Sequence, residues 1–165
     1  MDLEVKKRVL RLFTYGLYAV TAAHNSEVAG MTANWLGQAA FEPPMLMAAF
    51  EADSRTLAVV RHSGTFAVNV YESGQRELAG QLGRASVKRP DKLEAIASQP
   101  GPLTGAPLLD AALAWVECRV TGELPSGDQS SARGSPSTVT GVISAGWPPG
   151  RITKTPSRPS PTGPI

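Results

Sequence analysis

Apolar residues recur at every second position in several short runs of this sequence, which is the spacing of a strand with one buried face. The alternation is regular in "TFAVNVYE" (65–72) and in "LAWVECRV" (113–120), so both are predicted strands. "LYAVTAA" (17–23) is rich in Tyr, Val and Thr, and the turn-forming "HNSE" after it predicts a hairpin with "VAGMT" (28–32). "MLMAAFE" (45–51) is a short apolar run typical of a buried strand.

Three other segments have helical spacing. Residues 2–13 carry apolar side chains among charged ones, which predicts a short amphipathic helix. Ser54 is a favourable N-cap for "RTLAVVRH" (55–62), and Gly64 is expected to end that helix. "SGQRELAGQLG" (73–83) is the third predicted helix, with leucines four positions apart.

Residues 84–107 are charged and contain Pro and Gly, which predicts a long excursion with a short helix near Lys92 to Ala97. A loop of that length in a compact domain is often functional. The expected fold class is mostly β with inserted helices, because helices lie between strands and at least one hairpin is present. A mixed or largely antiparallel barrel is therefore favoured over a doubly wound sheet.

Length and composition indicate one globular domain, with 165 residues of which 42% are hydrophobic and 18% charged. The sequence contains no run of about 18 apolar residues, so no transmembrane helix is predicted. The opening "MDLEVKKRVLRLF" lacks the apolar core of a signal peptide. The single cysteine, Cys118, excludes an internal disulfide framework and falls in an alternating run, which predicts a buried apolar role. We expect a cytoplasmic protein with no membrane partner.

The net charge of +2 is unevenly distributed. Up to Gln129 there are 12 Lys and Arg against 14 Asp and Glu, whereas the remainder has four basic residues and no acidic one. Residues 1–129 therefore lack the excess of basic residues that is typical of nucleic-acid-binding proteins, and no nucleic-acid partner is predicted. Phosphate-loop, zinc-helix and serine-hydrolase motifs are absent from the sequence, and its two histidines lie far apart. We predict neither a metal site nor a catalytic nucleophile.

The stretch "TANWLGQAA" (32–40) combines small, polar and aromatic residues in a way that suits a flat heterocyclic ligand. Small residues allow the main chain to approach closely, Asn34 and Gln38 offer hydrogen bonds, and Trp35 offers an apolar wall. The alternative is a strand and loop in which the amide side chains only satisfy nearby backbone groups.

The order of five segments resembles the flavin reductase-like family with the FMN-binding split β-barrel fold. They are "LFTYGLYAVTA", "GMTANWLGQAAFEPP", "DSRTLAVVRHSGTFAVNV", "PLLDAALAWVECRV" and "GD". The first two are also similar to the flavin reductase domain at the C-terminus of some flavodiiron proteins. The likeness covers about residues 10–128, and its most specific part is "TANWLGQAAFEPP".

The resemblance implies a set of FMN-binding residues. The isoalloxazine edge would be lined, largely through backbone groups, by Thr32, Ala33, Asn34 and Trp35, with the wall continued by Gln38, Ala39 and Ala40. The family often has Ser where this chain has Ala40, so the resemblance implies that one hydrogen bond to the flavin would be lacking. Ser54 and Thr56 would meet the FMN phosphate.

A physical argument supports the same phosphate position. Ser54 and Thr56 fall at a predicted helix N-terminus, where unpaired N–H groups and the dipole favour an anion, and Arg55 adds charge. The alternative is an ordinary N-cap. Lys88 is a candidate second phosphate contact, although Arg84, Arg89 and Lys92 would serve equally, and a solvated loop accounts for the same charges.

The implied activity is transfer of hydride from NAD(P)H to the flavin, for which no catalytic side chain is predicted because the cofactor performs the chemistry. The family usually has Gly-Asp-His near the nicotinamide, where this chain has Gly127-Asp128-Gln129, and glutamine does not titrate near neutral pH. Family sites usually lie at a subunit interface, which implies a homodimer. The alternatives are a non-catalytic flavin-binding electron carrier or sensor, and an inactive truncated relative.

After Gln129 the resemblance ends. Residues 130–165 are rich in Ser, Pro and Gly, and such a segment buries too little surface to offset its ordering entropy. Only "STVTGVISAGW" within it has strand character. We therefore divide the chain into a split-barrel domain, 1–129, and a tail, 130–165, that is either disordered or the product of a reading-frame shift near codon 129. The closing strands of the barrel are accordingly expected to be missing or altered.

Overall fold

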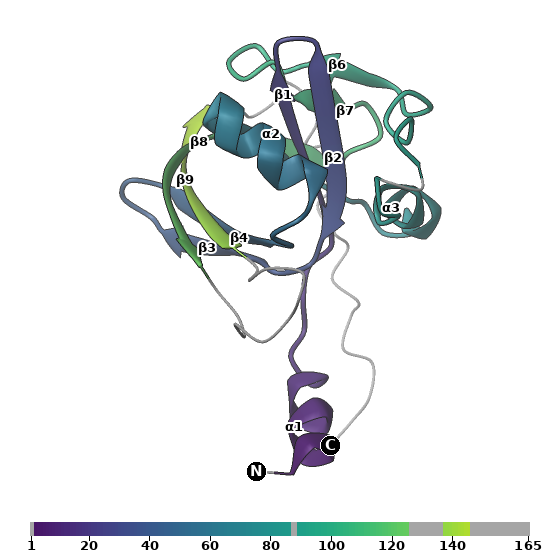
Figure 1. Ribbon diagram of the computed structural model, residues 1–165, viewed down its shortest axis with the longest axis vertical. Helices are drawn as coiled ribbons and strands as arrows, with labels where there is room; N and C mark the ends of the chain where they lie inside the picture. Colours follow the sequence, from purple (N-terminus) through teal and green to yellow (C-terminus); the bar gives the residue numbers. More distant parts are fainter. Residues whose placement is uncertain (1, 87–88, 126–136, 146–165) are drawn as a thin grey trace, which may run out of the picture.

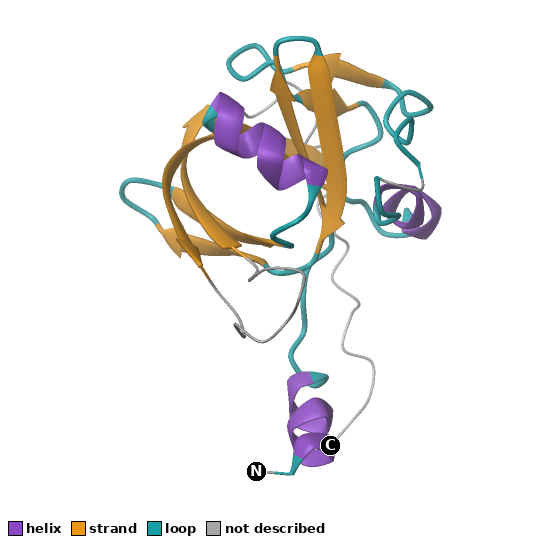
Figure 2. Ribbon diagram, in the orientation of Figure 1, coloured by secondary structure: helices purple, strands orange, loops and turns teal. Residues whose placement is uncertain are grey.

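The computed structural model describes residues 2–86, 89–125 and 137–145. Within them a curled antiparallel sheet is accompanied by three helices (Figures 1 and 2). The helices are α1 (Leu3–Leu10), α2 (Arg55–Ser63) and α3 (Arg76–Leu82). The strands are β1 (Tyr18–His24), β2 (Glu27–Ala33), β3 (Leu36–Ala40), β4 (Met45–Phe50), β5 (Thr65–Val70), β6 (Ser98–Pro100), β7 (Pro107–Leu109), β8 (Ala114–Pro125) and β9 (Ser137–Ala145).

The main sheet has the strand order β2-β1-β5-β8-β9-β4-β3, with every neighbouring pair antiparallel. Its two outermost strands, β2 and β3, are consecutive in the chain and are joined only by Asn34 and Trp35. So short a link spans at most about 11 Å between Ala33 and Leu36. The two edges of the sheet must therefore meet, which requires the sheet to curl into an open barrel, and residues 34–35 lie at its seam. The predicted barrel class is confirmed.

Helix α2 lies across the concave side of the curled sheet (Figure 1) and completes the main core. Its Leu57 and Val60 pack in one cluster with Val20 of β1 and Val68 of β5. The predicted capping is confirmed: the Ser54 hydroxyl accepts from the Leu57 N–H at 3.2 Å. At the other end Gly64, with φ 67°, occupies the left-handed conformation that ends the helix.

Strand β9 pairs with both β8 and β4 and joins the two halves of the sheet. It falls within "STVTGVISAGW", the part of the tail with predicted strand character. The expectation that residues after Gln129 contribute no packed structure is therefore corrected for 137–145. Gly141 of β9 explains the fit, since a Cβ there would lie 2.8 Å from the Phe66 ring. The other residues of the predicted tail lie outside the described ranges.

The long excursion contains a small hairpin, β6–β7, and turns, but no helix near Lys92 to Ala97, so that prediction is wrong. The Ile96 N–H donates to the Leu93 carbonyl at 3.0 Å, a bond that spans three residues. Tertiary contacts hold this segment in a non-helical form, since the Lys92 ammonium group donates to the Leu82 carbonyl at 2.9 Å and to the Arg84 carbonyl at 2.7 Å. Leu93 and Ile96 nevertheless join Leu82 of α3 in a second buried cluster.

Helix α1 stands apart from the barrel, and none of its residues is buried (Figure 1). Its Asp2 N-cap and a Lys7–Glu4 ion pair at 3.0 Å support it locally. No helix in the described ranges is long and apolar enough to span a membrane.

Candidate functional site

A cleft of about 1030 Å³ opens beside the seam of the barrel. One wall is formed by the end of β2 and the seam residues, and another by the end of β4, the loop after it and the first turn of α2. Residues 82–86 and Lys92 complete the lining. The short β2–β3 link and the β4–α2 loop therefore bring two sequence-distant motifs, "TANW" and "DSRT", to one place.

The predicted ring-binding residues Thr32, Ala33, Asn34 and Trp35 all line this cleft. Ala33 is buried, whereas Asn34 and Trp35 are exposed. An exposed amide and an exposed indole beside a small residue suit a flat, hydrogen-bonding ring system.

The Thr32 hydroxyl makes its hydrogen bonds on the side of α3. It donates to the Ala79 carbonyl at 2.6 Å and is 3.1 Å from the Tyr71 hydroxyl, which therefore donates to it. Burial of the phenol raises the pKa of Tyr71. Thr32 is thus left to meet a ligand through its backbone groups, as the resemblance implies, while its side chain fastens α3 to β2.

Three of the predicted wall residues, Gln38, Ala39 and Ala40, belong to β3 and are not among those that line the cleft. The Gln38 side-chain amide donates to the Ala40 carbonyl at 3.3 Å and is exposed to solvent. This contact matches the alternative hypothesis, in which the amide side chain of Gln38 satisfies a nearby backbone group. Lys88 lies outside the described residues.

The first turn of α2 carries the predicted anion-binding residues. Ser54 and Thr56 both line the cleft, but their hydroxyls differ. The Ser54 oxygen is occupied by its capping bond. Thr56 is 1% exposed, and its hydroxyl has no hydrogen-bond partner among the described residues. A buried, unsatisfied hydroxyl costs stability and calls for a specific explanation, for which a ligand oxygen is suitable.

Cationic groups gather around this end of the cleft. Arg55 pairs with Glu27 at 2.9 Å between Nε and Oε1. Lys92, 7% exposed, donates to the carbonyls of Leu82 at 2.9 Å and Arg84 at 2.7 Å. Burial lowers the pKa of Lys92, and the positive charge of Arg55 lowers it further. Arg84 and Lys92, two of the cations that the sequence left open, both line the cleft, and of these two Lys92 is the buried one.

Glu51 and Asp53 also line the cleft, so its positive groups are partly balanced. Within the described residues no group of three or more His, Cys, Asp or Glu is placed to hold a metal ion. The arrangement can bind an extended ligand with a planar ring at the seam and an anionic group at α2. Among the residues of the cleft that the structure describes, no nucleophile is paired with a base.

A buried carboxylate, that of Glu117 on β8, lies away from the cleft. Glu117 is fully buried, and its Oε1 accepts from the Thr104 N–H at 2.8 Å, from the Thr104 hydroxyl at 2.6 Å and from the Leu103 N–H at 3.2 Å. The alternation of residues in β8 does not reveal that Glu117 is buried, because the loop that covers its side chain belongs to the long excursion, residues 84–107. Cys118 beside it is buried as predicted, and that burial raises its pKa to about 12.

Comparisons with known proteins give the family of this fold. The family model of the flavin reductase like domain matches residues 10–141. The match therefore extends beyond Gln129, where the predicted resemblance ends. The chain is 28% identical over 128 residues to the "Flavin-dependent monooxygenase, reductase subunit HsaB" of Mycobacterium tuberculosis, covering 78% of this chain and 66% of that one. It is 28% identical over 132 residues to "Diflavin flavoprotein A 1" of Synechocystis, covering 78% of this chain and 22% of that one.

A solved structure shares the fold. The "NADH:FAD oxidoreductase SgcE6" of Streptomyces globisporus superposes with a TM-score of 0.75 at 27% identity, over 89% of this chain and 84% of that one. The chain spans about two thirds or less of the length of the curated relatives named above. The family match alone covers most of the sequence. The protein therefore belongs to the flavin reductase-like domain family.

Proposed function

We propose that this protein is an NAD(P)H-dependent flavin reductase that binds FMN in the cleft at the barrel seam. The observation that carries the proposal is the meeting of two features in one cleft. These are the "TANW" wall and the first turn of α2, where the buried hydroxyl of Thr56 has no partner among the described residues.

The residues present fit a flavin mononucleotide. Backbone groups of Thr32 and Ala33, with the side chains of Asn34 and Trp35, would hold the ring. The N-terminal turn of α2 with Thr56 would hold the phosphate, supported by the positive charges of Arg55 and Lys92. Ser54 would contribute through its position rather than its side chain, because its oxygen already caps the helix. Gln38, Ala39 and Ala40 do not line the cleft and remain predicted contacts only, as does Lys88, which lies outside the described residues.

In the proposed reaction a reduced nicotinamide gives up one hydride, two electrons with a proton, and leaves as NAD(P)⁺. The bound flavin supplies the hydride-accepting chemistry. The chain's own part is to hold the ring at the seam and to leave room beside it for the second ring, for which a cleft of about 1030 Å³ is suitable. The name of the Streptomyces relative, an NADH:FAD oxidoreductase, supports the nicotinamide.

A flavin-binding electron carrier without nicotinamide chemistry is the second candidate. It is favoured by Gln129, which stands where the family usually has a histidine and cannot exchange a proton near neutral pH. In either role we propose a cytoplasmic protein that works as a homodimer.

The test is a titration of FMN with purified protein, followed by flavin fluorescence. We expect saturable quenching at one flavin per chain, weakened in Asn34→Ala but not in Asn25→Ala, a matched control at the tip of the β1–β2 turn. NADH and NADPH oxidation would then be measured with excess FMN. Turnover supports the reductase, and binding without turnover supports the carrier. A folded protein that leaves flavin fluorescence unchanged would contradict both.

A further inference from the structure

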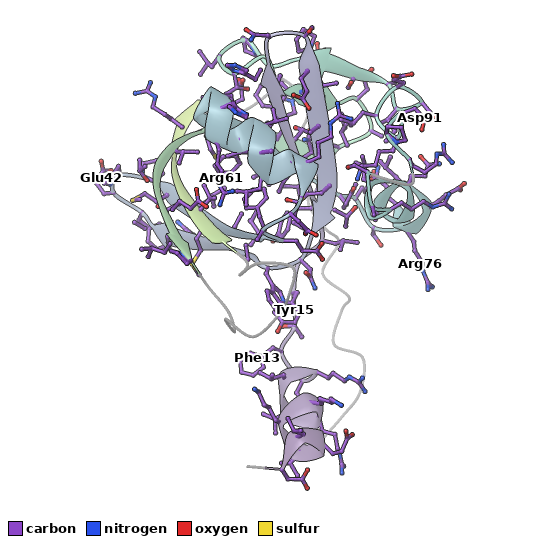
Figure 3. All side chains as sticks on the ribbon, viewed as in Figure 1. Phe13, Tyr15, Glu42, Arg61, Arg76 and Asp91 are labelled. Atoms are coloured by element: carbon purple, nitrogen blue, oxygen red, sulfur yellow. The ribbon has the colours of Figure 1, made fainter. Side chains whose placement is uncertain are left out.

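Helix α3 has little local stability of its own, although its end borders the cleft. It has seven residues, too few for a stable isolated helix, and Gly80 within it lowers its helical propensity further. Its N-cap residue, Gln75, makes no side-chain capping bond and donates its amide to the Ala111 carbonyl instead. In Figure 3 Arg76, at the start of the helix, extends away from the barrel. The position of α3 therefore depends on contacts made by its last turn.

The last turn of α3 is held to β2 by a chain of two hydroxyl groups. The Tyr71 hydroxyl donates to the Thr32 hydroxyl at 3.1 Å, and the Thr32 hydroxyl donates to the Ala79 carbonyl at 2.6 Å. A Cβ at Gly83 would lie 3.8 Å from the Cβ of Thr32, so this turn packs directly against Thr32. Thr32 and Gly83 both line the cleft, whereas Tyr71 is not among the lining residues. Tyr71 is therefore connected to the cleft through Thr32.

A second set of hydrogen bonds holds the same turn from the side of the excursion. The buried ammonium group of Lys92 donates to the carbonyls of Leu82 and Arg84. The last carbonyls of a helix have no partner within that helix, so these bonds satisfy groups that need one. Residues 82–86 line the cleft. Two clamps, the Tyr71–Thr32 chain and the Lys92 bonds, thus hold one turn of α3 at the cleft.

We propose that Tyr71 and Lys92 are positioning residues: they fix the last turn of α3 as a rigid wall of the cleft and so set its affinity for flavin. The inference rests on the proposed flavin site, because it concerns how the shape of that site is maintained. The first clamp acts at the ring end, since the backbone of Thr32 is a proposed ring contact, and the second acts at residues 82–86. Because both clamps hold the same turn, loss of either should weaken binding of the ring as well as that of the phosphate.

The first test compares two threonines that make the same kinds of hydrogen bond. The Thr21 hydroxyl donates to the Pro107 carbonyl at 2.7 Å and accepts from the Asn69 amide at 3.2 Å, but Thr21 does not line the cleft. Thr32→Val and Tyr71→Phe should each raise the Kd for FMN roughly fivefold, the effect of about one lost hydrogen bond. Thr21→Val should lower the melting temperature and leave that Kd unchanged. Thr32→Ser, which keeps the hydroxyl, should bind FMN as wild type does.

The second test separates positioning from contact with the phosphate. Riboflavin carries the same ring as FMN but has no phosphate. Lys92→Met should raise the Kd for both ligands roughly tenfold, whereas a residue that only contacts the phosphate would affect FMN alone. Arg89→Met is the matched control, because Arg89 is a cation of the same excursion that pairs with Asp91 and does not line the cleft. It should leave both affinities unchanged.

Hydrogen exchange of the ligand-free protein gives a measurement that needs no flavin. The Gly83 N–H, which donates to the Ala79 carbonyl at 2.9 Å, should exchange faster in Tyr71→Phe and Lys92→Met than in wild type and Thr21→Val. A folded wild type that binds no flavin would refute the proposed function and this inference with it. If wild type binds FMN, an unchanged Kd in Tyr71→Phe, or a loss in Lys92→Met confined to FMN, would overturn this inference alone.

Discussion

Replacement of Thr56 by valine should stabilise the free protein and weaken its binding of FMN. Valine keeps the shape of the side chain but removes the hydroxyl. That hydroxyl is buried in the first turn of α2 and has no hydrogen-bond partner among the described residues.

The magnitudes follow from this environment. A buried polar group without a partner costs about 1–3 kcal/mol, so its removal should raise the free energy of unfolding by about 1 kcal/mol. For a domain of this size that corresponds to about 2–4 °C in melting temperature. A hydrogen bond to a charged phosphate contributes about 2 kcal/mol, so the Kd for FMN should rise roughly thirtyfold.

Thr21→Val is the matched control with the opposite stability effect. Thr21 is equally buried, but its hydroxyl donates to the Pro107 carbonyl at 2.7 Å and accepts from the Asn69 amide at 3.2 Å. The same chemical change there should destabilise the protein by about 2 kcal/mol and leave the Kd for FMN unchanged, because Thr21 does not line the cleft.

Thermal unfolding and fluorescence titration of both variants would decide the matter. If Thr56→Val destabilises the protein, its hydroxyl has a structural partner, and the reasoning from an unsatisfied group fails. If stability rises while FMN binds as tightly as to wild type, the α2 turn is not the phosphate site.

Three further predictions concern the barrel. Gly141→Val should lower the free energy of unfolding by roughly 1–3 kcal/mol in a denaturant titration, because even a Cβ would lie 2.8 Å from the Phe66 ring, and an unchanged midpoint would contradict the placement of β9. Glu117→Leu should cost about 2 kcal/mol in the same assay, since it leaves the N–H groups of Leu103 and Thr104 without their acceptor; equal stability would show that loop to be independent of β8. Cys118 should resist a thiol reagent at pH 8 until the protein unfolds, because burial raises its pKa to about 12. The same shift predicts that the contribution of the neutral thiol to stability is fully present below pH 9 and decreases as the pH rises towards 12.

Most of the barrel could be predicted because apolar residues alternate along its strands, although β5 is buried on both faces once the excursion packs against it. The alternation in β5 and β8, and the capping of α2 by Ser54 and Gly64, are local signals that tertiary packing reinforces. The excursion was less predictable. Lys92, Leu93 and Ile96 are held by contacts to distant residues around Leu82, and no local pattern encodes those contacts.

The candidate site was predictable only in part, for a similar reason. Residues 32–35 and 54–56 stood out because each combines small and polar residues beside a chain reversal. Their proximity depends on the curl of the sheet, which no short motif specifies. Lys92 was left among several equivalent cations, because only the fold shows that its ammonium group ties residues 82–84 to the cleft wall.

The seam gives a physical reason for a ligand site at this position. Asn34 and Trp35 span the gap between the two edge strands, β2 and β3, which do not pair with each other, so the seam leaves strand edges without a strand partner, although the Trp35 carbonyl accepts from the Ala49 N–H of β4 at 2.9 Å. A ring that bonds to the backbone groups at these edges would take the place of the missing strand partner. A ligand that binds only the folded state also adds stability in proportion to the logarithm of its concentration over Kd. Bound flavin should therefore raise the resistance of β2 and β3 to hydrogen exchange more than that of β5 and β8, whose backbone groups are paired on both sides.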